Sequence, residues 1–409
     1  MGRRGSLRQR SAKEWVIRLG LAGAAAWIGY LSVLQSLAVA LPASQIERAY
    51  ALAPGNGRIA ARLSEVLSGP EATPEDRARA ARVARAALQH EPTAVGAVAT
   101  LGLDALIRGD EAEAKRLFSY SQHLSRRDLR TQLWAIEDAV ASGEISSALK
   151  HYDIALRTKR TAPELLYPVL SAAIANQEVR AGLVTTLAAK PIWGDSFVYY
   201  AAANSSEPGN TAGLFKGLRR AGYPIPDRAN NALVNALRAD NAFEEAWSYY
   251  SAIREGADRR RSRDPDFKAM LETPLAFDWV AENSAGISTA LQPRPDGGLF
   301  DFAVSPSVSG RLLWQQQMLP EGEYVLEGHS VGIDQPSGSR PYWTLSCLGG
   351  RELGRLQLRN SSEAEGRFSG RFTVPANCPV QVLALIARSS SEIDGVAGQI
   401  DRAQIRPLR

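Results

Sequence analysis

Histidine, cysteine and methionine are scarce in this chain of 409 residues, which contains four, two and three of them. No H-x-x-x-H, C-x-x-C, G-x-S-x-G, Walker or dinucleotide-binding glycine motif occurs in the sequence. Zinc binding and histidine-based catalysis therefore have no basis in the pattern. The acidic pair Glu244-Glu245 is expected on a solvated helix face. We predict a protein without catalytic residues, metal or cofactor.

Positive charge is concentrated at the N-terminus. The formal net charge is +5 at pH 7. Within residues 1–18 a single acidic residue, Glu14, stands against Arg3, Arg4, Arg8, Arg10, Lys13 and Arg18. The rest of the chain is close to neutral, and no patch interleaves arginines with aromatic residues. We therefore expect no nucleic-acid partner.

An uncharged stretch follows this basic tail and runs from Leu19 to Ile46. Its clearly apolar part, residues 19–41, would form a helix of about 34 Å, enough for the ~30 Å hydrocarbon core of a bilayer. Because basic flanks stay cytoplasmic, we predict a cytoplasmic tail (1–18), one inner-membrane helix (19–41) and a periplasmic C-terminal bulk. The alternative is a signal peptide that ends at Ala38-Val39-Ala40 and exports the same domains.

The two cysteines, Cys347 and Cys378, both lie in the C-terminal part of the chain. A pair confined to one β-rich region of an exported protein predicts a disulfide. Its loop of 31 residues would stabilise the fold by about 3–4 kcal/mol in the chain-entropy model. The alternative is a pair of buried free thiols.

A period of 34 residues organises the alanine-rich region after the apolar stretch. Gly109, Ala114 and Phe118 are followed 34 residues later by Gly143, Ala148 and Tyr152. One period earlier stand Ala80 and Ala84, and the pattern returns with slipped spacing at Asn241, Ala246 and Tyr250. The small residue fits a close helix crossing, the aromatic fills the gap to the next hairpin, and glycine or asparagine ends a helix in the left-handed conformation.

Residues 44–258 therefore resemble tetratricopeptide repeats, most clearly over 75–155. The resemblance implies an α-solenoid whose concave face binds a partner protein. The residues expected on that face are Thr100, Leu103, Asp104, Leu133, Trp134 and Glu137. The alternative places Leu103 and Trp134 in the core between repeats.

A linker is predicted over residues 259–274, beginning within the arginine run of 258–265. Two interpretations of this run stay open. It forms a site for a polyanion or lipid headgroup, or it is a solvated helix end where cations are favoured.

From residue 275 the pattern changes to the period of two typical of strands. Residues 299–304, 342–347 and 367–374 alternate, and 380–387 is a continuous apolar run expected of a central strand. About eight short strands indicate an antiparallel β-sandwich over 275–409. The segments 319–326 and 398–405 resemble framework elements of carbohydrate-binding jelly-roll modules. The predicted fold class is thus multidomain α plus β.

The tryptophans and tyrosines of the sandwich are candidates for stacking on sugar rings. We name Trp314, Tyr342 and Trp343 as possible carbohydrate-binding residues. Because Tyr342 and Trp343 are neighbours on one strand, one of them must face outward. The alternative for each tryptophan is packing in the core or between domains.

An anchor, helical repeats and a jelly-roll-like domain together resemble accessory proteins of bacterial envelope or exopolysaccharide assembly. We expect a non-catalytic, periplasm-facing adaptor whose repeats bind other envelope proteins. A first alternative is a carbohydrate-binding protein that acts through the sandwich and contacts polysaccharide. An enzyme with an unrecognised site is a second alternative.

Overall fold

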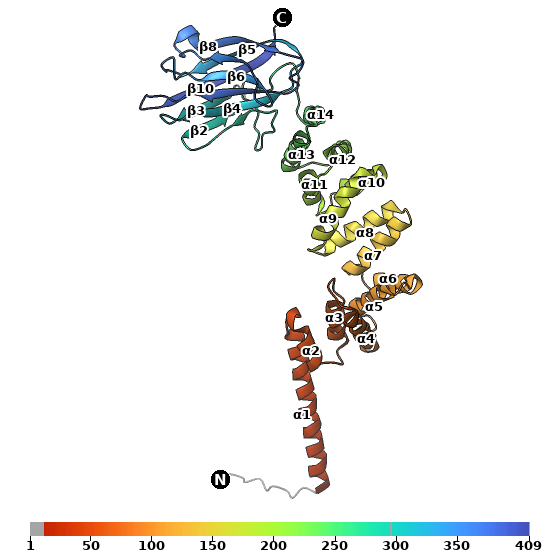
Figure 1. The fold of residues 1–409 in the computed structure, drawn as a ribbon. Coiled ribbons are helices and arrows are strands. Elements are labelled where there is room, and N and C mark those ends of the chain that lie inside the picture. Colours follow the sequence, from red (N-terminus) through yellow and green to blue (C-terminus); the bar gives the residue numbers. More distant parts are fainter. Residues whose placement is uncertain (1–11, 295–296, 409) are drawn as a thin grey trace, which may run out of the picture. The chain divides into compact units, whose positions relative to one another are not determined.

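The computed structural model describes residues 12–294 and 297–408. Within those residues it contains fourteen α-helices followed by ten β-strands (Figure 1). The chain divides into two compact units, Met1–Leu166 and Tyr167–Arg409. Most of the predicted basic tail, residues 1–11, lies outside the described residues.

Helix α1 (Ala12–Ala40) has the position of the predicted membrane segment. It is long and apolar enough to cross a membrane, and a signal sequence shares these features. Its surface is exposed over almost its whole length. Only near its end does Ala38 pack with Ile46 and Ala49 of α2 (Ile46–Leu52). Membrane insertion of this helix and its direction both stay predictions.

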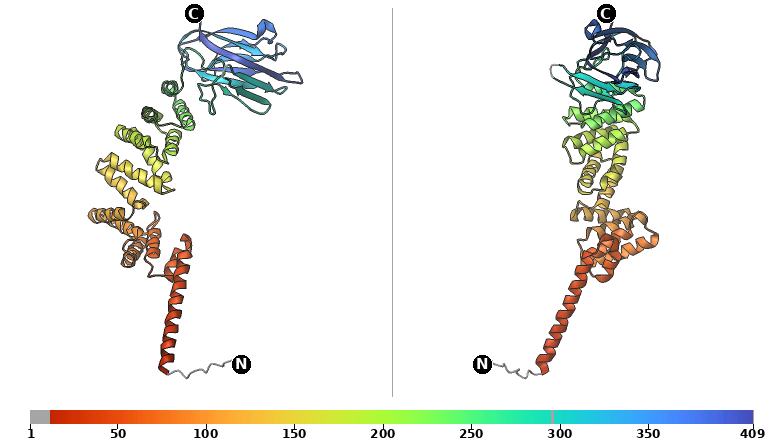
Figure 2. Two further views of the ribbon diagram at one scale, coloured as in Figure 1. Left: turned by 180° about the vertical axis from the view of Figure 1, so that it is seen from behind. Right: turned by 90° about the vertical axis from the view of Figure 1, so that its left-hand side faces the viewer.

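Three pairs of helices follow in the first unit, and they can be followed by colour in Figure 2. They are α3 (Gly57–Leu67) with α4 (Pro74–His90), α5 (Val95–Ile107) with α6 (Glu111–Leu124), and α7 (Leu129–Ala141) with α8 (Ile145–Thr158). The predicted crossing residues are all buried: Ala80, Ala84, Ala114, Phe118, Ala148 and Tyr152. The 34-residue period therefore does describe helix pairs that pack through these positions.

The glycines of the period end their helices as predicted. Gly109 and Gly143 have φ of 77° and 73°. The amide of Gly109 donates to Leu106 O at 3.0 Å and the next amide donates to Ala105 O at 2.9 Å. This pair of bonds is the Schellman motif, which satisfies carbonyls at a helix end and requires a left-handed residue. Asn241, with φ of 58°, ends its helix in the same way.

The second unit begins within α9 (Ala162–Ala172) and continues through the remaining helices. These are α10 (Gln177–Ala188), α11 (Gly194–Ala203), α12 (Pro208–Arg220), α13 (Asp227–Ala239) and α14 (Phe243–Ile253). The packing is less regular here, because α10 packs on α12 and α11 on α13. This agrees with the weak periodicity of the sequence between the prolines at 163 and 226.

Two five-stranded antiparallel sheets form the C-terminal sandwich (Figures 1 and 2). The first has the order β1 (Val280–Ala281), β4 (Gly310–Gln317), β9 (Gln381–Ala387), β6 (Tyr342–Cys347) and β7 (Glu352–Gln357). The second has the order β2 (Ile287–Gln292), β3 (Leu299–Val304), β10 (Val396–Pro407), β5 (Gly322–Val331) and β8 (Arg367–Val374). Strand β9 is central in its sheet, as its apolar run predicts.

The core of the sandwich lies between the two sheets. Its largest buried side chains include Trp343, Phe300 and Phe302. The predicted disulfide is present, and it links Cys347 at the end of β6 to Cys378 just before β9, with 5.6 Å between their Cα atoms. The bridge therefore ties two segments that meet at one end of the first sheet.

The segment 259–274 lies against the sandwich and α14. The carboxylate of Asp278, 1% exposed, accepts from Tyr250 Oη at 2.9 Å and from Arg263 Nη1 at 2.5 Å. The guanidinium of Arg254 lies 3.5 Å away from it. Three arginines of the predicted run thus pair with carboxylates: Arg263 with Asp278, Arg259 with Glu244, and Arg261 with Asp258.

Candidate functional site

A hollow of about 540 Å³ opens on the first unit, and we call it the repeat hollow. Helices α5 and α7 supply most of its wall, and the loop after α3 closes one side. Its lining residues are Ser68, Gly69, Pro70, Arg77, Leu103, Leu106, Ile107, Phe118, Leu129, Arg130, Leu133, Trp134, Glu137 and Leu165. The lining residues are mainly apolar, and a few of them are charged.

Four of the six residues predicted for the concave face line this hollow: Leu103, Leu133, Trp134 and Glu137. Trp134 also stacks on Phe118, with ring centroids 5.0 Å apart and planes within 11°. Trp134 thus belongs both to the packing between helices and to the wall. Binding of a partner by these residues stays a prediction.

Two of the six predicted residues lie elsewhere. Asp104 pairs with Arg108 at 3.2 Å and does not line the hollow. The prediction for Thr100 is wrong, because its side chain is 2% exposed and lies within 3.5 Å of Ser64 and Ser68 hydroxyls. The threonine hydroxyl can be buried here because neighbouring hydroxyl groups hydrogen-bond to it.

Arg130 is a lining residue that the sequence did not single out. Its Nη1 donates to Ser68 Oγ at 2.6 Å, and its Nη2 donates to Glu65 O at 2.6 Å. These bonds satisfy groups at the end of α3 from the first turn of α7. A positive charge in the first turn of a helix is unfavourable because of the helix dipole. This unusual position could have indicated from the sequence that Arg130 has a specific partner.

A half-buried carboxylate, that of Glu65, lies beside this arginine. Burial raises the pKa of Glu65 above its usual value, Asp128 raises it further, and Arg130 lowers it. No room remains next to it, since a Cβ on Gly96 would lie 1.5 Å from Glu65 Oε1. The first unit therefore holds a poorly solvated acid close to the repeat hollow.

The sandwich places the predicted sugar-binding residues differently. The prediction for Trp343 is wrong, because its side chain is 0% exposed and lies in the core. Alternation along β6 then turns Tyr342 outward. Trp314 of β4 faces the same side, because Trp314 and Thr344 both pair with Ala384 and Tyr342 lies two residues from Thr344.

Guanidinium groups cover both outward aromatic rings. Arg355 and Arg388 lie 4.1 and 4.9 Å from the centroid of Tyr342, and Arg311 lies 5.0 Å from that of Trp314. Such cation–π contacts leave less of each ring for a sugar. The outer face of the first sheet is therefore mixed aromatic and basic.

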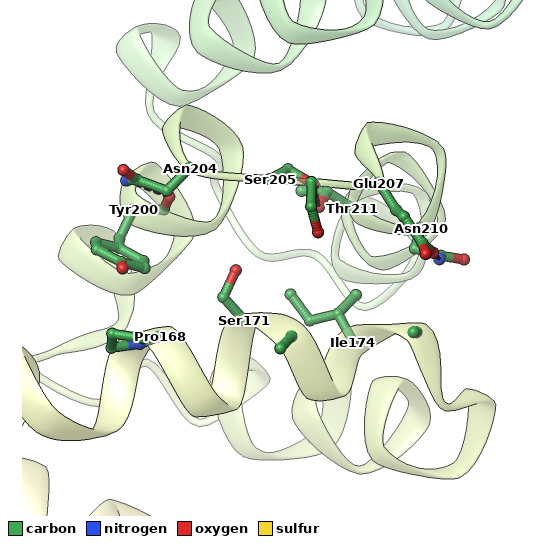
Figure 3. A pocket seen from close by; sticks show the side chains of 12 residues that line it. Pro168, Ser171, Ile174, Tyr200, Asn204, Ser205, Glu207, Asn210 and Thr211 are labelled. Carbon is green, nitrogen blue, oxygen red and sulfur yellow. Dashed lines mark hydrogen bonds between the residues drawn. The ribbon is translucent and has the colours of Figure 1, made fainter. Parts of the chain in front are cut away.

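A second hollow, of about 400 Å³, lies among α9, α11 and α12. Figure 3 shows Ser171 and Ile174 facing the segment that contains Ser205 and Thr211. The hydroxyls of Ser205 and Thr211 lie 2.9 Å apart. This polar hollow was not predicted, because a run of small polar residues after α11 has the composition of an ordinary loop.

The described residues bring together no group of three or more histidine, cysteine, aspartate or glutamate side chains able to hold a metal ion. The shifted pKa values among the described residues follow from burial, ion pairing or hydrogen bonding in the fold. For example, burial and the neighbouring Asp195 raise the pKa of Tyr223 well above its usual value.

No family model matches the chain, and no curated protein matches its sequence. Solved structures that are similar to parts of it include a carbohydrate-binding module, a secretory protein and a phage tailspike domain. A carbohydrate-binding module from Cellvibrio mixtus lichenase 5A, in complex with cellotriose, is 9% identical with a TM-score of 0.22, covering 33% of this chain and 100% of that one. With a TM-score this low, the similarity defines neither fold nor function.

The other two similarities are equally limited. Accessory secretory protein 1, 2 and 3 of Streptococcus pneumoniae is 16% identical with a TM-score of 0.20, covering 30% of this chain and 86% of that one. The enzymatically active domain of bacteriophage CBA120 tailspike protein 4 is 11% identical with a TM-score of 0.22. That match covers 32% of this chain and only 19% of the tailspike chain.

Proposed function

We propose that this protein is a non-catalytic scaffold, anchored by α1, that binds a segment of a partner protein in the repeat hollow. The observation that carries the proposal is the apolar wall formed by Leu103, Leu106, Ile107, Leu133 and Trp134 in one hollow. Contiguous exposed apolar surface on a folded domain marks an interaction site.

The chemistry of the wall defines the class of partner. Ile107 and Leu165 are more than half exposed, so apolar side chains of a partner would displace water from them. Arg77 and Glu137 offer charged contacts beside this apolar wall. A partner segment with two or three apolar anchor residues and flanking charges fits this arrangement.

The cellular setting is part of the same proposal. The apolar helix α1 and the disulfide between Cys347 and Cys378 support a location outside the cytoplasm. The resemblance of the paired helices to tetratricopeptide repeats supports protein binding. An envelope protein of polysaccharide assembly is the partner that we propose.

Affinity purification from detergent-solubilised membranes tests this function. Leu133→Glu places a charge on the wall, and Val140→Glu makes the same change on α7 outside the hollow, where the side chain is 53% exposed. We expect the co-purifying partner to be lost with Leu133→Glu and retained with Val140→Glu. A partner that stays bound to the Leu133→Glu protein contradicts the proposal.

A second candidate function is carbohydrate binding by the sandwich. The observation that favours it is the common outward face of Trp314 and Tyr342 on the first sheet. A glycan array probed with the full chain tests it, because Tyr342→Ala should abolish any specific signal. Binding that survives both Tyr342→Ala and Trp314→Ala excludes this face as the sugar site.

A further inference from the structure

The outer face of the second sheet carries a hollow of about 1080 Å³ that we call the arginine hollow. It is lined by Arg261, Val325, Glu327, Ser369, Gly370, Arg371, Arg406, Pro407 and Leu408. Three guanidinium groups thus face one carboxylate. Neither the repeat hollow nor the aromatic face of the first sheet shares a residue with it.

Strand register builds this hollow. Val325 of β5 pairs with Arg371 of β8 on one side and with Arg406 of β10 on the other. All three side chains point outward, because Tyr324 and Leu326 are in the core. Val325 is nevertheless only 7% exposed, as expected if the stems of neighbouring arginines cover it.

The segment before the sandwich adds the third arginine. The amide of Ser262 donates to Ile405 O at 3.0 Å, and the amide of Ile405 donates to Ser262 Oγ at 3.0 Å. The chain is thereby held beside β10, where β3 no longer pairs with it. Arg261 consequently stands next to Arg406 on the outer face. A row of Arg261, Arg406, Val325 and Arg371 crosses four chain segments.

Carboxylates of the same protein neutralise only some of the arginines in this row. Glu327 binds Arg406 through two bonds of 2.8 Å, and Asp258 pairs with Arg261 at 2.9 Å. The side chain of Arg371 is exposed and makes no hydrogen bond or ion pair with any residue that the structure describes. Three guanidinium groups and one carboxylate line the hollow, so its net positive charge favours an anion from outside.

The Glu327–Arg406 pair sets the character of the site. Hydrogen bonds from Arg406 lower the pKa of Glu327, so this carboxylate is ionised at neutral pH and accepts hydroxyl donors. Ser369 supplies a further hydroxyl on the same wall. A ligand that carries both carboxylates and hydroxyls matches this set better than a bare anion does.

We propose that the arginine hollow binds an acidic polysaccharide, with a carboxylate of a uronate residue held by Arg371 and sugar hydroxyls held by Glu327 and Ser369. Guanidinium forks bind carboxylates with two parallel hydrogen bonds. Arg371 and Arg406 stand two strand spacings apart, roughly 10 Å, which is about the length of a disaccharide. The site is independent of the repeat hollow and of Tyr342.

Binding of the full detergent-solubilised chain to polygalacturonate, followed by isothermal titration calorimetry, tests the proposal. The matched control is Arg359→Gln, since Arg359 is also exposed and makes no hydrogen bond or ion pair among the described residues. We expect Arg371→Gln to weaken binding at least tenfold, Arg359→Gln to leave it unchanged, and the carboxyl-reduced neutral polymer not to bind.

Any of four results would overturn the proposal. Polygalacturonate binding that is the same with Arg371→Gln, or weakened equally by Arg359→Gln, shows that this hollow is not the site. Loss with Tyr342→Ala but not with Arg371→Gln assigns the sugar to the first sheet instead. Vesicles containing phosphatidylglycerol that bind in an Arg371-dependent way, while polygalacturonate does not, identify a lipid headgroup as the occupant.

Discussion

Arg130 Nη1 donates a hydrogen bond of 2.6 Å to Ser68 Oγ, joining residues that stand 62 positions apart in the chain. The bond connects the first turn of α7 to the end of α3, past α5. The other terminal nitrogen of Arg130, Nη2, donates a hydrogen bond of 2.6 Å to Glu65 O. One side chain therefore connects the first helix of the third pair to the end of the first helix of the first pair, and it also lines the repeat hollow.

Arg130→Ala should destabilise the first unit. The substitution leaves the carbonyl of Glu65 and the hydroxyl of Ser68 without this donor, so we expect a loss of about 1–3 kcal/mol in the free energy of unfolding. Urea denaturation followed by circular dichroism measures it. Arg157→Ala is the control, because Arg157 forms an exposed pair with Asp153 at 2.8 Å whose loss should cost only about 0.3–0.5 kcal/mol. Equal midpoints for the two variants would contradict the assigned role.

Glu65→Gln should raise stability at neutral pH. The pKa of Glu65 is higher in the folded chain than its ordinary value of 4.5, chiefly because the carboxyl is buried. The folded state therefore holds this proton more tightly than the unfolded state. Stability is greatest below the unfolded pKa and falls as pH rises through the folded pKa. The neutral amide removes that loss.

Thermal unfolding between pH 4 and pH 8 checks this prediction. The melting temperature of Glu65→Gln should exceed that of the wild type at pH 8 and converge with it at low pH. Glu71→Gln is the matched control, since Glu71 is an exposed residue of the same unit for which no such divergence is expected. A Glu65→Gln protein that is less stable at pH 8 would show that the carboxylate makes a favourable contact.

Features that depend on residues close together in the sequence could be predicted from the sequence alone. The strands 299–304, 342–347 and 367–374 have the predicted bounds, because alternation of polar and apolar residues is a local property. The left-handed ends at Gly109 and Gly143 were predicted for the same reason. The crossing alanines followed from the repeat period alone.

Other features depend on pairing across the chain. A shift of one residue in the strand would exchange the orientations of Tyr342 and Trp343. Only the position of the second sheet decides which of the two side chains faces outward. The row of Arg261, Arg406 and Arg371 requires the strand order β10-β5-β8, which no local pattern contains. Thr100 was misplaced because its hydroxyl neighbours, Ser64 and Ser68, come from another helix pair.

Asp278→Ala should loosen the attachment between α14 and the sandwich. The carboxylate is buried and lies within 3.5 Å of both Arg254 and Arg263. Removing it leaves two largely buried guanidinium groups without their counter-ion, which costs about 3–5 kcal/mol for a buried pair. We expect faster trypsin cleavage within 254–263. Glu282→Ala, which removes an exposed partner of Arg311, is the control that should leave cleavage unchanged.

Gly109→Ala and Gly143→Ala should each destabilise the first unit, although neither glycine has another atom within 4 Å of where a Cβ would stand. The cost is conformational, because φ of 77° and 73° is unfavourable for alanine by about 1 kcal/mol. Gly55→Ala is the control, since its site is equally open and its φ lies outside the left-handed region.

Urea denaturation separates the three variants. The control should be neutral or slightly more stable, because alanine has a less flexible unfolded state. The two helix-end variants should unfold at lower urea concentration, and their effects should add, since the sites belong to different helix pairs. Equal stability for Gly55→Ala and Gly109→Ala would mean that the left-handed ends contribute nothing to folding. The 34-residue period would then reflect only the packing between helices, and not the way in which the helices end.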